Sequence, residues 1–198
     1  MILKNIRCGC EPSGVSSKDV KYVQILSTAA PKFFDADVRG DVINQGADGS
    51  CVSQCLYEMV RYDREKWNHD TCPIDREWVY NRRQNKTVEG MTPREGMEIL
   101  RRNGIVSLYA RIPSVMAMKS ALVSCGPILI ALPVYNTTNQ FWIGDDRLVG
   151  YHAVTVTAFN ENEFTFKNTW GLEWGSYGYG YLPISDCNKI IESWVILK

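Results

Sequence analysis

The sequence has no excess of charge of either sign. Its 198 residues contain 22 Lys plus Arg and 22 Asp plus Glu, so the formal net charge is zero. Proteins that bind nucleic acid or anionic membrane surfaces usually carry a surplus of basic residues, because those cations hold the phosphates and release counterions. We therefore expect neither nucleic acid nor a membrane among the partners of this protein.

Long apolar segments are also lacking. The longest runs from residue 126 to residue 133. That is far short of the roughly 20 residues of a membrane-spanning helix, and it is predicted to form a buried strand. The first ten residues bring charges before any extended apolar stretch, unlike a secretory signal. The sequence therefore predicts an intracellular, cytoplasmic protein.

Histidine is scarce, and the cysteines do not have the spacing of a metal site. The chain has two histidines, His69 and His152, and seven cysteines, so at least one thiol is free in a monomer. Cys8 and Cys10 form one close pair, but a zinc site needs further ligands at matching spacing, and no second pair provides them. We expect no metal and no cofactor. His69 has no motif around it and is predicted to be a solvated residue near a helix end.

The sequence does contain enough apolar material for a packed core, arranged in two patterns. Hydrophobic residues make up 45% of the chain, which excludes a disordered protein. Apolar residues at helical spacing, together with capping residues, predict helices over 50–67, 75–82, 92–103 and 114–123. Apolar runs bounded by turn residues predict strands over 127–135, 152–159, 163–168, 178–183 and 193–197.

This order of elements, helices first and strands later, indicates an α+β protein. We predict a helical N-terminal lobe over residues 36–110, packed against a β-rich C-terminal lobe over residues 111–198 that forms an antiparallel sheet or barrel. Residues 1–35 contain short apolar pieces between prolines and glycines, and are predicted to be an N-terminal extension of loop and extended chain.

Cys51 is the first candidate for chemistry. It ends the segment 45–51 (QGADGSC) and falls at the start of the predicted helix over 50–67. Unpaired backbone N–H groups and the positive end of the helix dipole favour a thiolate there, and a neighbouring histidine would lower the pKa of the thiol further. The backbone N–H of Cys51 and the side chain of Gln45, across the turn, could both donate to an oxyanion.

His152 and Asn168 form a second candidate pair. His152 opens one predicted strand and Asn168 ends the next, so a hairpin between them can bring the two side chains together. The amide would fix the tautomer and orientation of the ring, while Trp170 would shield their hydrogen bond from water. With Cys51 and Gln45, these residues fill the roles of nucleophile, base, orienting group and oxyanion donor in a cysteine protease.

Three blocks of the sequence resemble the signature blocks of the papain family, in the family's order: residues 45–51, 150–154 (GYHAV) and 167–179 (KNTWGLEWGSYGY). Residues 37–39 and 90–104 are similar to stretches typical of its compact microbial and viral branch. The resemblance implies a papain-like two-lobe fold, an active site in the cleft between the lobes and cysteine endopeptidase activity. Beside the four catalytic residues, it implies that Gly49, Ser50, Tyr151, Trp170 and Trp174 bind substrate or support the site.

The chain departs from the family pattern near the cleft. Asp48 stands where the family has a cysteine, so the family's disulfide beside the nucleophile cannot form, which fits a reducing compartment. Val52 and Tyr151 also replace the usual residues, so the substrate preference of relatives cannot be carried over. The segment before residue 36 is short for an inhibitory propeptide. Activity is therefore controlled in another way, or this segment lies across the cleft.

Two other functions remain open alternatives. A papain fold could serve as a catalytically silent structural or binding protein, for example a virion component that binds other virion proteins. A thiol amidase or isopeptidase would share the chemistry and differ in substrate. Aromatic residues over 170–181 could stack on nucleic acid or glycan, but they lack basic neighbours.

Cys55, one helical turn after Cys51, is predicted to pack in the core. The preferred hypothesis is a cysteine endopeptidase that acts on protein or peptide substrates.

Overall fold

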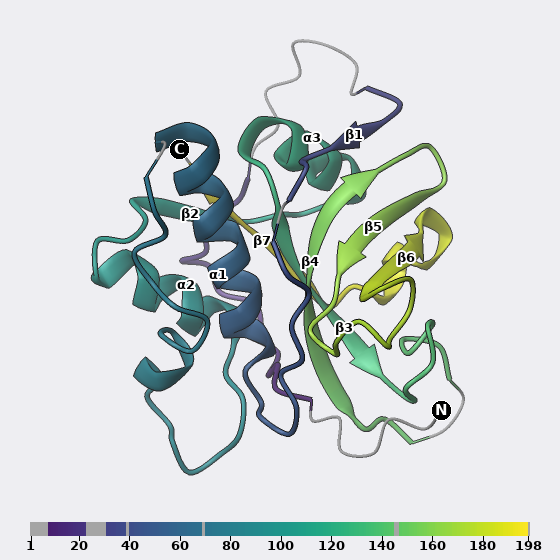
Figure 1. Cartoon of the computed structure of the whole chain (residues 1–198), viewed down its shortest axis with the longest axis horizontal. Coiled ribbons are helices and arrows are strands. Elements are labelled where there is room, and N and C mark those ends of the chain that lie inside the picture. The colour runs from purple at the N-terminus through teal and green to yellow at the C-terminus, as the bar shows by residue number, and fades with distance from the viewer. Residues whose placement is uncertain (1–7, 23–30, 39, 69, 145–146, 198) are drawn as a thin grey trace.

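The computed structural model describes residues 8–22, 31–38, 40–68, 70–144 and 147–197. The predictions for His69 and for the first seven residues lie outside these ranges. Figure 1 shows helices α1 (Cys51–Asp63) and α2 (Pro93–Arg102) beside one face of a twisted sheet. Within the described ranges, no helix combines the length and the apolar character that crossing a bilayer requires.

The helices begin and end close to where the sequence predicts them. A π-helical turn, Arg64–Asn68, extends α1, and α3 spans Val115–Cys125. The start of α2 shows why its prediction succeeds: Thr92 Oγ1 accepts a hydrogen bond from the N–H of Glu95 at 3.0 Å, and proline occupies the first helical position. Helix α2 ends before Gly104, whose φ of +68° suits glycine.

The predicted helix over 75–82 is wrong for most of its length. The chain forms turns there, followed by one 3-10 turn, Tyr80–Arg82. Ser53 of α1 explains the difference, because its hydroxyl donates to the carbonyl of Arg76 at 2.8 Å and accepts from the N–H of Tyr80 at 3.0 Å. Tertiary hydrogen bonds thus replace the helical ones that the local sequence favours.

The strands form one antiparallel sheet in the order β2-β7-β3-β4-β5-β6, with β1 paired to β4. The sheet is open and does not close into the barrel that was the other possibility. A second 3-10 segment, Ile184–Lys189, connects β6 to β7. The strands are β1 (Phe34–Asp35), β2 (Leu108–Arg111), β3 (Ile128–Val134), β4 (Gly150–Phe159), β5 (Glu163–Lys167), β6 (Tyr179–Pro183) and β7 (Glu192–Leu197).

The core lies on both faces of this sheet. One apolar cluster joins α3 to Ile130 and Val154, and another joins α1 and α2 to Leu129 and Ala153. Strand β3 is buried along its whole length because it contributes to both clusters. Burial on both faces accounts for its continuous apolar sequence, and the prediction of a buried strand is confirmed.

A buried ionic cluster ties helix α1 to the end of β5. Lys167 Nζ lies 3.2 Å from Glu58 Oε2 and donates to the carbonyl of Gly40 at 3.1 Å. Arg61 Nη2 lies 2.8 Å from the same oxygen of Glu58. Because one buried partner without the other would be costly, this cluster fixes the helix that begins at Cys51 relative to the strand that precedes Asn168.

Candidate active site

Cys51 begins helix α1 and is fully buried. The turn before it is tight, with Gly46 at a φ of +62° and its N–H donating to Asn44 Oδ1 at 2.9 Å. Backbone groups of Ala153, Gly9 and Val52 lie close enough to the thiol to oppose the rise of its pKa. Since Ala153 follows His152 in β4, the thiol lies next to the strand that carries the histidine. Cys51 of the helical lobe therefore lies against the β-rich lobe at this position.

His152 and Asn168 are hydrogen-bonded. His152 Nε2 lies 2.7 Å from Asn168 Oδ1, and both side chains are buried. The same Oδ1 accepts from the N–H of Thr169 at 2.8 Å, which identifies it as the carbonyl oxygen of the amide. Nε2 therefore carries the proton, and Nδ1 is left as the basic nitrogen. Nδ1 has no hydrogen-bond partner among the described residues.

Aromatic rings cover this hydrogen bond. The ring of Trp170 stacks on that of His152, with centroids 4.4 Å apart and planes 25° from parallel. Phe141 packs its edge against His152 and also contacts Trp170. Trp174 meets Trp170 edge to face at 5.6 Å. The rings exclude water from the His152–Asn168 pair, which strengthens a hydrogen bond and fixes the imidazole plane. No motif in the sequence marks Phe141.

Gln45 is held beside the same block. Its backbone N–H donates to the carbonyl of Thr169 at 2.8 Å, and its side-chain oxygen accepts from the hydroxyl of Thr169. The amide nitrogen donates to the carbonyl of Asp48 at 2.7 Å, within the turn that leads to Cys51. These contacts hold the amide NH2 group of Gln45 against the turn that leads to Cys51. Ser50, also in that turn, accepts with its carbonyl from the N–H of Gln54.

The electrostatics of the pair differ from the expectation. Burial raises the pKa of Cys51 to about 11, although the neighbouring N–H groups oppose this shift. Burial also lowers the pKa of His152 to about 4, partly offset by the hydrogen bond to Asn168. The prediction of a lowered pKa for Cys51 is therefore wrong for the structure described. Desolvation outweighs the helix terminus, so the thiol and the imidazole are both neutral.

The N-terminal segment contributes to this burial, because it lies against Gly49 in the turn before Cys51 and pairs with Tyr151 beside His152. We call residues 8–22 the strap. The N–H of Cys10 donates to the carbonyl of Tyr151 at 3.2 Å, and Met91 exchanges backbone hydrogen bonds of 3.0 Å with Gly9 and Glu11. The strap therefore bridges the helical lobe and the sheet. Gly9 lies so close to Gly49 that a Cβ added to Gly9 would be 2.1 Å from the carbonyl oxygen of Gly49.

Charged groups hold the rest of the strap. Both guanidinium nitrogens Nε and Nη2 of Arg94 donate to the carboxylate of Asp19, each at 2.7 Å, and this pairing lowers the pKa of that carboxyl. Arg94 also donates to the carbonyl of Ser13, and Arg111 Nη1 to that of Gly14 at 2.6 Å. The sequence does not predict these contacts, because nothing local marks a partner that is 75 or more residues away.

The described elements have the papain-like fold. Xylellain, a cysteine protease from Xylella fastidiosa, matches with a TM-score of 0.83 and 19% identity, over 99% of this chain and 97% of its own. Procathepsin B S9 from Trypanosoma congolense matches with a TM-score of 0.75 and 15% identity, over 96% and 85% of the two chains. Procathepsin L 3 of Tenebrio molitor matches with a TM-score of 0.73 and 15% identity, over 96% and 76%. The predicted papain-like two-lobe fold is confirmed.

The sequence itself is similar to an uncharacterized peptidase C1-like protein of Acanthamoeba polyphaga mimivirus. The two are 43% identical over 56 residues, which is 26% of this chain and 18% of that protein. The match therefore spans less than a fifth of the viral protein. No family model matches this chain. Together the comparisons confirm the resemblance to papain-like cysteine proteases and to a microbial or viral branch.

The buried neutral histidine should make the fold sensitive to acid. Above the ordinary pKa of 6.5, His152 is neutral in both the folded and the unfolded chain. Between pH 6.5 and pH 4 only the unfolded chain takes up the proton, so stability falls as the pH is lowered. We expect a loss of about 3 kcal/mol in the free energy of unfolding across this range. Urea denaturation at pH 7 and pH 4 measures it.

The matched control for this prediction is His152→Gln, which replaces the titrating ring by an uncharged amide side chain of similar length. Carboxylates elsewhere titrate equally in both chains, so the difference between the two pH profiles isolates His152. A wild-type profile as flat as that of the variant would mean that His152 is solvated and that the strap does not seal the cleft.

Proposed function

We propose that this protein is a cysteine endopeptidase whose cleft is closed by its own N-terminal strap. The observation that supports catalysis most is the arrangement of Cys51, His152 and Asn168. The thiol lies at a helix N-terminus beside the histidine strand, and the amide leaves Nδ1 of the imidazole as the basic nitrogen. A buried histidine held in one tautomer, one residue before the strand position that lies beside a buried thiol, is poorly explained by packing alone.

In the proposed reaction, the strap first leaves the cleft and a peptide takes its place. Water and the peptide then lower the desolvation cost of the thiolate and the imidazolium. His152 Nδ1 takes the proton of the Cys51 thiol. The thiolate attacks the peptide carbonyl carbon. The N–H of Cys51 and the amide NH2 of Gln45 stabilise the oxyanion that forms.

The proton on His152 then passes to the nitrogen of the leaving amine, the C–N bond breaks, and the acyl group stays on the sulfur as a thioester. Water attacks the thioester carbonyl while Nδ1 of His152 accepts its proton, and the carboxylic acid product and free thiol are released. Asn168 keeps the ring in one orientation through both steps, and Trp170 keeps water from their hydrogen bond.

Labelling with a thiol-directed epoxide tests this proposal. We expect an adduct to form slowly on Cys51 in the wild-type chain, from the fraction of chains in which the strap has left the cleft, and none to form on Cys51 in His152→Ala; peptide mapping and mass spectrometry identify it. The other six cysteines serve as internal controls for general thiol reactivity. Equal labelling of Cys51 in both chains would mean that His152 does not activate it. A chain with an accessible cleft and an unreactive Cys51 would favour a silent papain fold used for binding.

The strap accounts for control of the activity. Its backbone hydrogen-bonds to residues on both walls of the cleft, and Gly9 lies against the thiol itself. A peptide cannot reach Cys51 while Gly9 lies there. This restraint needs only a short segment, because Arg94 and Arg111 anchor it from the two lobes. An amidase or isopeptidase would be restrained in the same way, so the substrate assay must use peptides with internal amide bonds.

Weakening the anchor should release activity. Asp19→Ala removes the carboxylate to which Arg94 donates two hydrogen bonds. We expect the rate of peptide hydrolysis to rise roughly three- to tenfold, because the strap has left the cleft in a larger fraction of the chains. The assay compares initial rates at equal concentrations of titrated Cys51. Lys18→Ala, at the exposed neighbouring position, should change the rate little. An unchanged rate for Asp19→Ala would show that the Arg94 contact does not hold the strap.

A further inference from the structure

Two thiols of the strap flank the residue that covers the proposed nucleophile. Cys8 and Cys10 stand on either side of Gly9, and Gly9 lies against the Cys51 thiol. All seven cysteines of the chain are free in the structure. Whenever the strap lies in the cleft, the most reactive thiol of the proposed mechanism therefore has other thiols close to it.

Cys8 lies on the wall of the cleft that carries the proposed base. A Cβ added to Gly150 would be 2.7 Å from Cβ and 3.3 Å from Sγ of Cys8, so the Cys8 side chain rests directly on Gly150. Residues two apart in a strand point to the same face, so Cys8 covers the face of β4 from which His152 projects. The nearness of Cys8 is also one of the causes that raise the pKa of Cys51. Cys8 is thus near both Cys51 and His152.

Cys10 is fixed more firmly than Cys8. Its side chain is 2% exposed and belongs to the apolar cluster between α1 and the sheet. Its N–H donates to the carbonyl of Tyr151 at 3.2 Å, and three residues further on the N–H of Ser13 donates to Glu192 Oε1 at 2.8 Å. The side chain of Cys8 is only half-buried. Of the two strap thiols, Cys8 is therefore the one that is accessible for a reaction.

We propose that Cys8 and Cys51 form a disulfide that holds the strap in the cleft when the chain meets an oxidising small disulfide. Reduction of this bond frees the strap again. The inference rests on the proposed peptidase function and names a control of the same site. Because the seven cysteines are otherwise free, a reductant that frees the strap breaks no other bond of the fold.

The oxidant is a low-molecular-weight disulfide of the glutathione class. In a chain whose strap has left the cleft, the Cys51 thiol passes its proton to His152, and the thiolate attacks one sulfur of the oxidant. The S–S bond of the oxidant breaks and a mixed disulfide forms on Cys51. One small thiol leaves with the proton from His152.

The second exchange takes place when the strap returns. Cys8 passes its proton to His152 and attacks the sulfur of Cys51, and the second small thiol leaves with that proton. Two protein thiols are then oxidised to one disulfide, and the small disulfide is reduced to two thiols. Because Cys8 belongs to the same molecule, its effective concentration at Cys51 favours this exchange over attack by a second chain.

Oxidised glutathione and the full-length chain test this inference. Wild type and Cys8→Ser are each incubated with it, quenched in acid and mapped by mass spectrometry without reduction. We expect wild type to give linked peptides that contain Cys8 and Cys51, with no glutathione left on Cys51. In Cys8→Ser the reaction should stop at the mixed disulfide, so that glutathione stays on Cys51.

Peptide hydrolysis gives a second readout. The rate of the oxidised wild-type chain should fall roughly tenfold or more, because the nucleophile is blocked, and should return when dithiothreitol is added. Cys8→Ala should behave as Cys8→Ser does, so a poorly folded serine variant does not end the comparison. Thermal melting of each chain establishes that it is folded.

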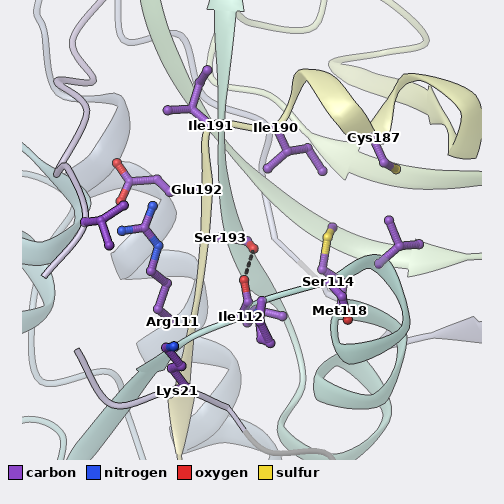
Figure 2. Close-up of a pocket in the computed structure, with 13 residues that line it drawn as sticks. Lys21, Arg111, Ile112, Ser114, Met118, Cys187, Ile190, Ile191, Glu192 and Ser193 are labelled. Carbon is purple, nitrogen blue, oxygen red and sulfur yellow. Dashed lines mark hydrogen bonds between the residues drawn. The ribbon is translucent and has the colours of Figure 1, made fainter. Parts of the chain in front are cut away.

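Two other thiols serve as controls. Cys10→Ser keeps Cys8 and should still give the linked peptides. Cys187 reports the general oxidation of buried thiols, because burial raises its pKa to about 11, as it does for Cys51 and Cys8. Figure 2 shows Cys187 beside Ile190 at a separate pocket, and no second cysteine is among the described residues that line this pocket. We expect Cys187 to stay unlinked.

The outcomes separate this inference from the proposed function. If a wild-type chain that hydrolyses peptides ends with Cys51 free or still joined to glutathione, the inference is overturned while the peptidase stands. A bond from Cys51 to Cys10 or to Cys55 also overturns it, because the partner is then a different thiol. Linked peptides of Cys8 and Cys51 from a chain that hydrolyses no peptide once it is reduced would leave the disulfide standing and contradict the proposed function.

Discussion

Replacing Cys51 by serine is expected to lower peptide hydrolysis by about 10⁴-fold or more, because the nucleophile of a covalent mechanism has no substitute in the cleft. The serine hydroxyl fits the buried position, but His152 is arranged for a thiol, and an alkoxide is far harder to form. The measurement is the initial rate on a peptide with an internal scissile bond, at enzyme concentrations high enough to detect the residual rate.

The matched control is Cys55→Ser. Cys55 lies one turn further along α1, is equally buried and belongs to the core cluster, as its helical position predicts. This change should cost some stability and little activity per folded molecule. A Cys51→Ser chain that kept more than a few per cent of the wild-type rate would contradict covalent catalysis at Cys51. An equal loss in Cys55→Ser would instead point to a general disturbance of α1.

Replacing Gly9 by alanine is expected to open the cleft. The added methyl group would lie 2.1 Å from the backbone oxygen of Gly49, a contact that no side-chain movement can relieve. The strap must therefore lift from the thiol, while Cys51, His152 and Asn168 are untouched. We expect the rate of peptide hydrolysis to rise roughly tenfold or more, in proportion to the fraction of open chains. The rate of Cys51 alkylation should rise in parallel.

Ser17→Ala is the control for this prediction, since it changes an exposed residue of the strap. It should leave both rates unchanged. Slower or unchanged hydrolysis in Gly9→Ala, with the fold retained by thermal melting, would mean that the strap is not the barrier. Alkylation measures the accessibility of the thiol, whereas hydrolysis measures catalysis. A rise in the rate of alkylation alone would therefore indicate a cleft that is open but catalytically inactive.

The sequence predicts the positions of the site residues better than it predicts their pKa values. Helix α2 and strand β3 are predictable because local capping residues and apolar runs determine them. The side chains of His152 and Asn168 meet because one hairpin joins β4 to β5, which the turn residues reveal. The lowered pKa expected for Cys51 also follows from local reasoning, namely its position at a helix N-terminus. Burial in the folded chain, to which the distant strap contributes, reverses that shift.

Long-range contacts account for the remaining differences. Ser13 and Glu192 are 179 positions apart, and Asp19 and Arg94 are 75 apart. Nothing in the spacing or hydropathy of either partner marks such a pair, because exposed-looking charged residues usually remain in water. The failure of the predicted helix over 75–82 has the same origin, since Ser53 binds that segment from another helix. Residues that hold the strap are therefore found only in the folded chain.

Capture of the acyl-enzyme tests the central claim most directly. The full-length Gly9→Ala chain is mixed with a peptide substrate, quenched in acid within a single turnover, and mapped by mass spectrometry. Our account predicts a mass increase on Cys51 equal to the acyl part of the peptide, joined as a thioester and absent in Cys51→Ser. Turnover without any acyl group on Cys51, or an acyl group on another residue, would contradict it.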